Sequence, residues 1–304
     1  MLYLKRYNKN RKLIMKITAS LVKKLRQRMG AGMMDCKKAL NATNGNIEKA
    51  IDLMRTLNTT KSAKKLDRIT IEGLVKINIS ANKKTVTILE VNSETDFVTK
   101  SDTFISFVNM LGVLALKTTP TNIEEFLSQP LSNGDSIEKA REEIIAKVGE
   151  NITIRRVQTI KTNNGIIGTY KHMDRIAVVT ILEKGDETLA KDIAMHIAAT
   201  NPECITEAEL SSDLLEREKA IFIEQSKKSG KPNNIIEKMI IGRMKKFVNG
   251  VTLYGQPFIK NHDTTIGKLM QLNNTQVKFF VRFEVGEGIE KKEKNFVDEV
   301  MAQI

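Results

Sequence analysis

The chain has 304 residues, of which 41% are hydrophobic, and a formal net charge of +13. This length allows roughly two domains of about 150 residues each, and the apolar content excludes a disordered chain. The longest apolar run, residues 110–116, is far shorter than a membrane span of about 20 residues. Since no signal-peptide pattern is present either, we expect a soluble, intracellular protein.

The cysteines and histidines predict neither a disulfide framework nor a metal centre. Cys36 and Cys204 lie far apart and outside any C-x-x-C motif. The three histidines, His172, His196 and His262, are too few and too scattered for a metal cluster. We therefore expect no metal and no cofactor.

The positive charge could indicate a nucleic-acid partner. The lysines, however, are spread along the chain and mixed with acids, and aromatic residues make up only 5%. No stacking motif of the kind that binds RNA bases is present. An RNA- or ribosome-binding basic protein therefore stays an alternative function.

Residues 1–15 form a basic tail. The first fourteen contain no acid and five basic residues, Lys5, Arg6, Lys9, Arg11 and Lys12. A short organellar presequence is one interpretation. The stretch lacks the length and the Ser and Ala content of such peptides, so a disordered tail, or an upstream start before Met15, is favoured.

Residues 16–55 predict three short helices. Thr18 can cap the first helix, and Gly30 ends it. The second helix follows Gly32, and the Asn44-Gly45-Asn46 turn leads into a third helix from Ile47. So small a bundle has little core of its own, and such modules usually bind a partner.

Met33 and Met34 stand side by side at the start of the second helix, so they cannot both face the core. One exposed Met would be a soft, adaptable contact for a partner, and filling a gap in the core is the equally weighted alternative. Residues 56–68 are polar and basic, and they predict a linker to the rest of the chain.

The central region contains a weak internal repeat of a hairpin followed by a helix. The first copy runs from Gly73 through a strand ending at Glu90, and the second from Gly168 through a strand ending at Glu183. A helix covering one face of an antiparallel sheet is an α+β plan. We expect a core N-subdomain over 69–158 and a core C-subdomain over 159–210 and 251–288.

A strand-to-helix corner at Thr95-Asp96-Phe97-Val98 distinguishes the two copies. Thr and Asp suit a helix N-terminus, where their oxygens accept from backbone N–H groups. Phe97 is either a core or staple residue or an aromatic held out for a partner. The second copy has Lys184-Gly185-Asp186-Glu187 here and no aromatic, which favours the exposed interpretation of Phe97 because a packing need should recur.

The remaining elements are a hairpin of helices, a strand and a last helix. A tight turn at Ser229-Gly230-Lys231-Pro232 joins two helices within 211–250, which must be antiparallel. Alternating apolar residues predict a strand from Val277 to Val285 with one buried face, and residues 289–304 predict a C-terminal helix. His196 lies beside the apolar stripe of its helix, so a half-buried structural histidine is the default.

Two stretches resemble the elongation factor Ts family of translation factors. One is Leu21 to Arg26 followed by Gly30 to Leu40, and the other is Thr95-Asp96-Phe97-Val98. The resemblance covers nearly all of residues 16–304. It implies an α+β fold with a ubiquitin-associated-like N-terminal module of three helices, two repeated sheet-plus-helix subdomains, a coiled-coil arm and a C-terminal helix that packs on the partner.

The resemblance implies a guanine-nucleotide exchange factor for elongation factor Tu, in its GDP-bound and nucleotide-free forms, in the bacterial cytoplasm. The residues implied to bind this partner are Arg26, Met33, Met34, Asp96, Phe97 and His196. Neither an enzyme nor a nucleotide-binding protein is expected, because the chain lacks a phosphate loop, a dinucleotide loop and the common hydrolase motifs. No membrane partner is expected, and nucleic acid is disfavoured.

Overall fold

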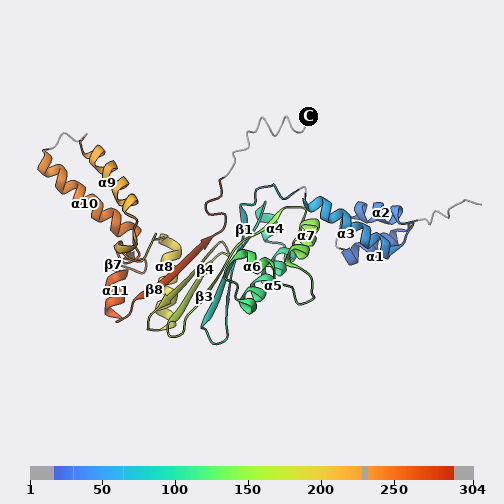
Figure 1. Ribbon diagram of the computed structural model, residues 1–304, viewed down its shortest axis with the longest axis horizontal. Coiled ribbons are helices and arrows are strands. Elements are labelled where there is room, and N and C mark those ends of the chain that lie inside the picture. The colour runs from blue at the N-terminus through green and yellow to red at the C-terminus, as the bar shows by residue number, and fades with distance from the viewer. Residues whose placement is uncertain (1–16, 30, 64, 228–231, 291–304) are drawn as a thin grey trace, which may run out of the picture. The chain divides into compact units, whose positions relative to one another are not determined.

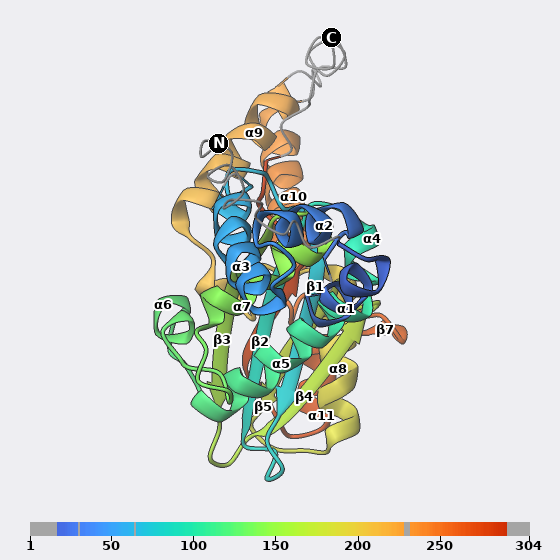
Figure 2. The same ribbon diagram turned by 90° about the vertical axis from the view of Figure 1, so that its right-hand side faces the viewer.

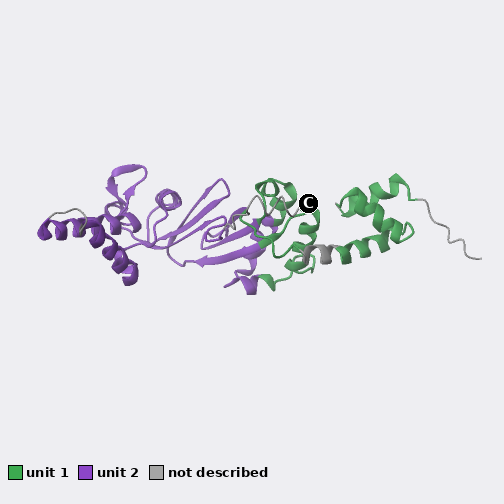
Figure 3. Cartoon of the chain, turned by 90° about the horizontal axis from the view of Figure 1, so that it is seen from above, with its two compact units in different colours: residues 1–72, 93–107, 127–153 green, residues 73–92, 108–126, 154–304 purple. Residues whose placement is uncertain are grey.

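The computed structural model describes residues 17–29, 31–63, 65–227 and 232–290, and it has the expected α+β architecture. The chain divides into two compact units (Figure 3). Unit 1 comprises residues 1–72, 93–107 and 127–153, and unit 2 comprises residues 73–92, 108–126 and 154–304. The basic tail and nearly all of the expected C-terminal helix lie outside the described residues.

Three helices open unit 1, as the sequence predicts: α1 (Ala19–Met29), α2 (Met33–Ala42) and α3 (Ile47–Ala63). They lie side by side (Figure 2) around a small core that includes Leu25, Leu40 and Met54. The expected cap is confirmed, because Thr18 Oγ1 accepts a hydrogen bond from the backbone N–H of Leu21.

Helix α3 is longer than the sequence suggested. It continues to Ala63, into the segment interpreted as a linker, and packs against α7 (Ile137–Val148). Residues 56–63 contain neither Gly nor Pro, so nothing in the sequence ends the helix at Arg55. A polar composition therefore does not by itself mark the end of this helix.

Unit 1 also contains the corner that follows the second strand of the chain. The one-turn helix α4 (Asp96–Thr99) leads into α5 (Asp102–Thr118), whose later turns belong to unit 2 together with most of α6 (Ile123–Leu127). Helix α7 begins at the cap Ser136 and ends at Gly149, which adopts the left-handed conformation with φ 83°.

Two three-stranded sheets, which fall almost entirely in unit 2, form its core (Figure 1). The first has the order β1 (Glu72–Ile79), β2 (Thr85–Ser93), β3 (Ile152–Lys161). The second has the order β4 (Ile166–His172), β5 (Ile176–Leu182), β8 (Val277–Glu284), with antiparallel pairs such as Thr169 with Val179 and Val179 with Val281. Ile88, Val179 and Phe283 belong to one hydrophobic core that joins the sheets.

The predicted plan of a hairpin followed by a helix is confirmed in the second sheet. Helix α8 (Glu187–Thr200) follows β5 and packs on β4 and β5. The approach is so close that a Cβ at Gly168 of β4 would lie 2.3 Å from the backbone of Ala190. In the first copy α5 packs on β1 in the same way, since a Cβ at Gly112 would lie 2.3 Å from Oδ1 of Asn78.

The hairpin of helices is present as α9 (Ser212–Lys227) and α10 (Asn233–Val251). The side chains of Gln225 and Arg243 form a hydrogen bond of 3.1 Å, and the rings of Phe222 and Phe247 lie 6.4 Å apart. Because the first pair lies nearer the turn than the second, the helices are antiparallel, as predicted. A 3-10 turn, η1 (Glu207–Glu209), precedes them.

After the hairpin, the chain adds β6 (Pro257–Phe258), β7 (Asn261–Thr265) and α11 (Ile266–Leu272), none of which the sequence predicted. Strand β8 follows as expected, but the prediction of a single buried face is wrong. Phe279 and Val281 pack in the core between the sheets, whereas Val277 and Phe280 pack with α8. Both faces of β8 are therefore covered.

Candidate functional site

Phe97 is the most exposed aromatic side chain that the structure describes. Its side chain is 80% exposed, whereas the next residue, Val98, is 8% exposed and buried. The interpretation of Phe97 as a core residue is therefore wrong. Burial of Val98 and Thr99 holds the single turn of α4 in place and leaves the Phe97 ring in solvent.

The corner before α4 is fixed by a carboxylate from a distant part of the sequence. Thr95 donates from its backbone N–H to Glu150 Oε2 at 2.9 Å and from its hydroxyl to Glu150 Oε1 at 2.6 Å. The sequence suggested that the Thr95 oxygen accepts from the helix N-terminus. The hydroxyl instead donates to Glu150, and Thr95 makes no side-chain cap.

Asp96 lies beside Phe97 and is half exposed. Its carboxylate accepts a hydrogen bond of 2.7 Å from Lys100 Nζ, one turn later, and that ammonium lies 5.9 Å from the centre of the Phe97 ring. An exposed ion pair of this kind contributes little to stability. Loss of this ion pair therefore changes the stability of the corner only slightly.

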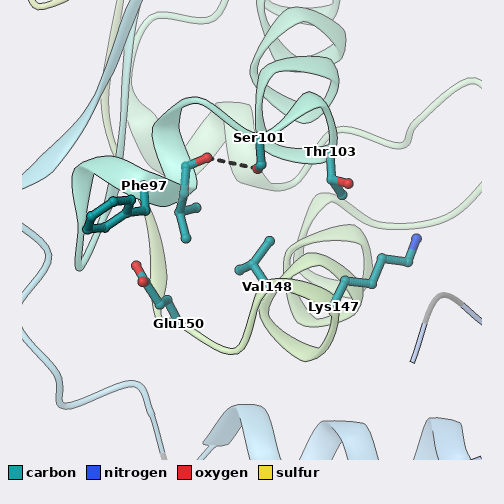
Figure 4. A pocket seen from close by; sticks show the side chains of 7 residues that line it. Phe97, Ser101, Thr103, Lys147, Val148 and Glu150 are labelled. Atoms are coloured by element: carbon teal, nitrogen blue, oxygen red, sulfur yellow. Dashed lines mark hydrogen bonds between the residues drawn. The ribbon is translucent and has the colours of Figure 1, made fainter. Parts of the chain in front are cut away.

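A cavity of about 500 Å³ adjoins Phe97 (Figure 4). Its lining residues are Phe97, Val98, Ser101, Thr103, Lys147, Val148 and Glu150. Val148 lies in the middle of this group, and the Lys147 side chain extends away from Phe97. The sequence analysis missed Val148, the last residue of α7, and Glu150, which follows that helix, because both come about fifty residues after Phe97.

The exposed methionines of the three-helix module form the second candidate contact in unit 1. Met33 is 59% exposed and Met34 is 61% exposed, so neither fills a gap in the core. Arg26, on α1, is also exposed. The expectation of at least one exposed methionine is confirmed, and the structure exposes both.

His196, in unit 2, has no exposed surface. Its Nε2 lies 3.0 Å from Oε1 of Gln256, and its Nδ1 accepts a hydrogen bond of 3.3 Å from the backbone N–H of Ile259. These partners require a proton on Nε2. Burial lowers the pKa of the imidazole below its ordinary value. The histidine is therefore neutral near pH 7 and holds the segment before β7.

The β4–β5 turn exposes residues that the sequence analysis did not select. Met173 is 80% exposed, and it and Asp174 both have positive φ, 49° and 57°. His172 is exposed at the same turn and lies 3.4 Å from the Tyr170 hydroxyl. A methionine in the three-residue turn 173–175 between two strands is the signal that could have found this surface.

Within the described ranges, no group of three or more His, Cys, Asp or Glu residues is placed to hold a metal ion. The same part of the chain contains no helix that is both long and apolar enough to cross a membrane. The features that stand out on unit 1 are thus exposed apolar side chains on well-packed supports, an arrangement typical of protein–protein contacts.

Comparison with known proteins gives one consistent result. The model of a family described as "Elongation factor TS" matches residues 94–287. The protein named Elongation factor Ts from Ruthia magnifica subsp. Calyptogena magnifica is 78% identical over 290 residues, which cover 95% of this chain and 98% of that protein. The proteins of the same name from Legionella pneumophila (strain Lens) and Methylococcus capsulatus are 49% and 48% identical, each over 95% of this chain and 98% and 99% of their own lengths.

Proposed function

Since the chain belongs to the elongation factor Ts family, we propose that it is a guanine-nucleotide exchange factor that binds elongation factor Tu and promotes release of GDP. In this role it serves translation elongation in protein biosynthesis and carries out no covalent chemistry. The observation that carries the proposal is the Phe97 ring, which is 80% exposed on a corner held by buried neighbours.

Exchange requires a difference in affinity. A protein that binds the nucleotide-free partner more tightly than the GDP-bound partner weakens GDP binding by the same factor. GTP-binding proteins hold the nucleotide through a phosphate loop, a magnesium ion and switch elements. We assign Asp96 and Phe97 to a wedge that intrudes beside a switch helix of the partner and disturbs its magnesium and phosphate site.

The rigid support of the wedge favours this assignment. A flexible aromatic would lose conformational freedom on insertion, whereas Phe97 stands on a turn already anchored through Val98. The cavity beside the ring, lined by Val148 among others, offers room for a side chain of the partner. The ion pair between Asp96 and Lys100 is exposed, so losing this one contact costs little stability.

Arg26, Met33 and Met34 form the proposed grip on the nucleotide-binding domain of the partner. Met side chains adapt to the surface they meet, and both lie open to solvent. We also propose the domain division predicted from the sequence, with residues 16–55 as the binding module, although α3 itself continues to Ala63. Removal of residues 1–55 is expected to leave the sheets folded and to weaken partner binding.

His196 takes a different part in this proposal from the contact that the family resemblance implies. Because its side chain is buried, we propose that it acts by holding Gln256 and the backbone at Ile259. Elongation factor Tu remains the proposed partner in both its GDP-bound and nucleotide-free forms. The proposed location is the cytoplasm, and no nucleotide, membrane or nucleic acid is assigned as a direct ligand.

The test is release of fluorescently labelled GDP from cognate elongation factor Tu, with and without this protein. Acceleration at catalytic amounts of the protein is expected, together with tighter binding to the nucleotide-free partner. No acceleration, accompanied by RNA binding that weakens steeply with salt, would favour the RNA-binding alternative that the net charge of +13 raises. Binding to elongation factor Tu without faster GDP release would indicate an adaptor and not an exchange factor.

A further inference from the structure

Glu150 occupies a short connection between two elements of unit 1. Helix α7 ends at Val148, Gly149 turns the chain in the left-handed conformation, and β3 begins at Ile152. The Glu150 side chain extends from this connection toward the turn of α4 (Figure 4). Its two carboxylate oxygens accept the two hydrogen bonds from Thr95, at 2.9 and 2.6 Å.

Helix α4 needs this external support. It has only four residues, so it offers few internal hydrogen bonds, and its N-cap residue Thr95 provides no side-chain cap. A carboxylate that accepts from both the N–H and the hydroxyl of one residue fixes the position and the direction of the chain at that point. Phe97 is two residues further on, so its ring direction depends on this point.

Neighbouring bonds hold the same connection to two other segments. The backbone N–H of Asn151 donates to Glu94 Oε1 at 2.6 Å. The Asn151 side-chain amide donates to the carbonyl groups of Leu66 and Arg68 at 3.1 and 2.9 Å. Residues 149–151 therefore hold the corner from outside, and the corner does not rest on its local sequence alone.

We propose that Glu150 is a positioning residue for Phe97. The carboxylate holds Thr95 and so keeps the α4 turn, and with it the exposed ring, in the orientation that enters the partner. The proposal rests on the exchange function proposed above. It assigns to Glu150 no contact of its own with elongation factor Tu.

The test compares Glu150→Ala, Thr95→Val and the double variant in labelled-GDP release from elongation factor Tu. Glu150→Ala should lower the exchange rate at saturating protein about tenfold. The concentration for half-maximal rate should change less than about threefold, because Arg26, Met33 and Met34 are untouched. Thr95→Val removes only the hydroxyl bond, so its loss should be smaller, and Thr95→Ser should keep the wild-type rate.

The double variant separates positioning from direct contact. If Glu150 acts through Thr95, adding Thr95→Val to Glu150→Ala causes no further loss. If the two losses multiply, at least one of these side chains contacts the partner directly, and the proposal is overturned. Glu143→Ala is the matched control, because it removes an exposed carboxylate from α7 and should leave the rate unchanged.

Hydrogen exchange of the free protein tests the support without any partner. Amides of residues 94–101 should exchange faster in Glu150→Ala than in the wild type, while amides of β5 keep their protection. If the amides of residues 94–101 are equally protected in Glu150→Ala and in the wild type, the proposal is overturned, even if the protein accelerates GDP release. The amides could also exchange faster in Glu150→Ala although the wild-type protein does not accelerate GDP release. That result would reject the proposed function, but it would still show that Glu150 supports the corner.

Discussion

Phe97 and Val98 are consecutive residues of α4 with opposite environments: the Phe97 side chain is 80% exposed, and the Val98 side chain is 8% exposed. The buried valine anchors the turn that presents the aromatic ring. The pair therefore separates the two things that a substitution at this corner can change, namely the stability of the fold and the contact with a partner.

Replacing Phe97 with alanine should leave the melting temperature nearly unchanged, because little of the ring is removed from solvent in the free protein. If the ring drives exchange, its loss should reduce the coupling between the protein and GDP by about 1–2 kcal/mol, or roughly 5–30-fold. The measurement is affinity for elongation factor Tu with and without GDP, alongside a thermal melt.

Val98→Ala is the control for Phe97→Ala, since it truncates the buried neighbour. Removing two buried methyl groups should cost about 1–2 kcal/mol of folding stability. Phe97→Ala could instead lower the melting temperature steeply and leave the ratio of the affinities with and without GDP unchanged in the folded fraction. That result would show that Phe97 stabilises the fold by packing, and it would reject the wedge.

The exposed methionines allow a similar comparison in the three-helix module. The double variant Met33→Gln/Met34→Gln should keep the stability of the wild type, because both side chains already face water. It should weaken binding to elongation factor Tu about tenfold, which titration calorimetry can measure. Met54→Gln is the contrasting variant: Met54 is 3% exposed, so the polar substitution should destabilise the module. Unchanged affinity in the double variant would remove the proposed grip.

His196 predicts a pH dependence of folding stability. Burial lowers its folded-state pKa below the ordinary value of about 6.5, so the unfolded chain binds a proton more readily. Its contribution to stability is therefore fully present above about pH 6.5 and is lost as the pH falls toward the folded-state pKa. The loss is at most about 1.4 kcal/mol per pH unit.

Urea unfolding at pH 7.5 and pH 5.5 checks this expectation. The fall in stability between the two values should be smaller in His196→Gln, whose amide can still donate to Gln256 but does not titrate. His262→Gln is the control, because His262 is exposed on β7 and its substitution should leave the wild-type profile. Identical profiles for the wild type and His196→Gln would show that His196 does not titrate on unfolding.

Glu90 is the buried centre of an ionic cluster in unit 2. Its side chain is fully buried, and its oxygens lie 3.0 Å from Arg155 Nη1, 2.5 Å from Arg156 Nε and 2.9 Å from the N–H of Gly286. Burial by itself would raise the pKa of Glu90. The Gly286 N–H and the two guanidinium groups outweigh burial, so the pKa lies below its ordinary value.

Glu90→Gln should therefore cost about 2–4 kcal/mol of stability at pH 7, because two arginines lose their counter-charge inside the fold. The contribution of Glu90 is present above its unfolded-state pKa of about 4.3 and is lost as the pH falls through the lowered folded-state pKa. The difference between wild type and variant in urea unfolding should thus shrink in acid. Glu183→Gln, at an exposed ion pair with Lys278, should cost much less stability at pH 7 than Glu90→Gln.

The amino-acid sequence by itself determined the elements whose signals are local. The cap Thr18 and the turn at Asn44 and Gly45 follow from short-range backbone and side-chain preferences, and the structure confirms them. The repeat of a hairpin followed by a helix could also be predicted, because each copy has the same order of strand, turn, strand and helix. Two short motifs were enough to indicate the family.

Only the tertiary structure decided which of these residues face solvent and what supports them. Periodicity cannot assign Phe97, because a four-residue helix is too short to show a buried face. His196 lies on a helix that the sequence predicts, but its hydrogen bonds are to Gln256 and Ile259, about sixty residues away. Glu150 accepts a hydrogen bond from Thr95, although the two residues are 55 positions apart in the sequence. The residues in these contacts are far apart in the sequence and meet only in the folded chain, so no local sequence pattern predicts the contacts.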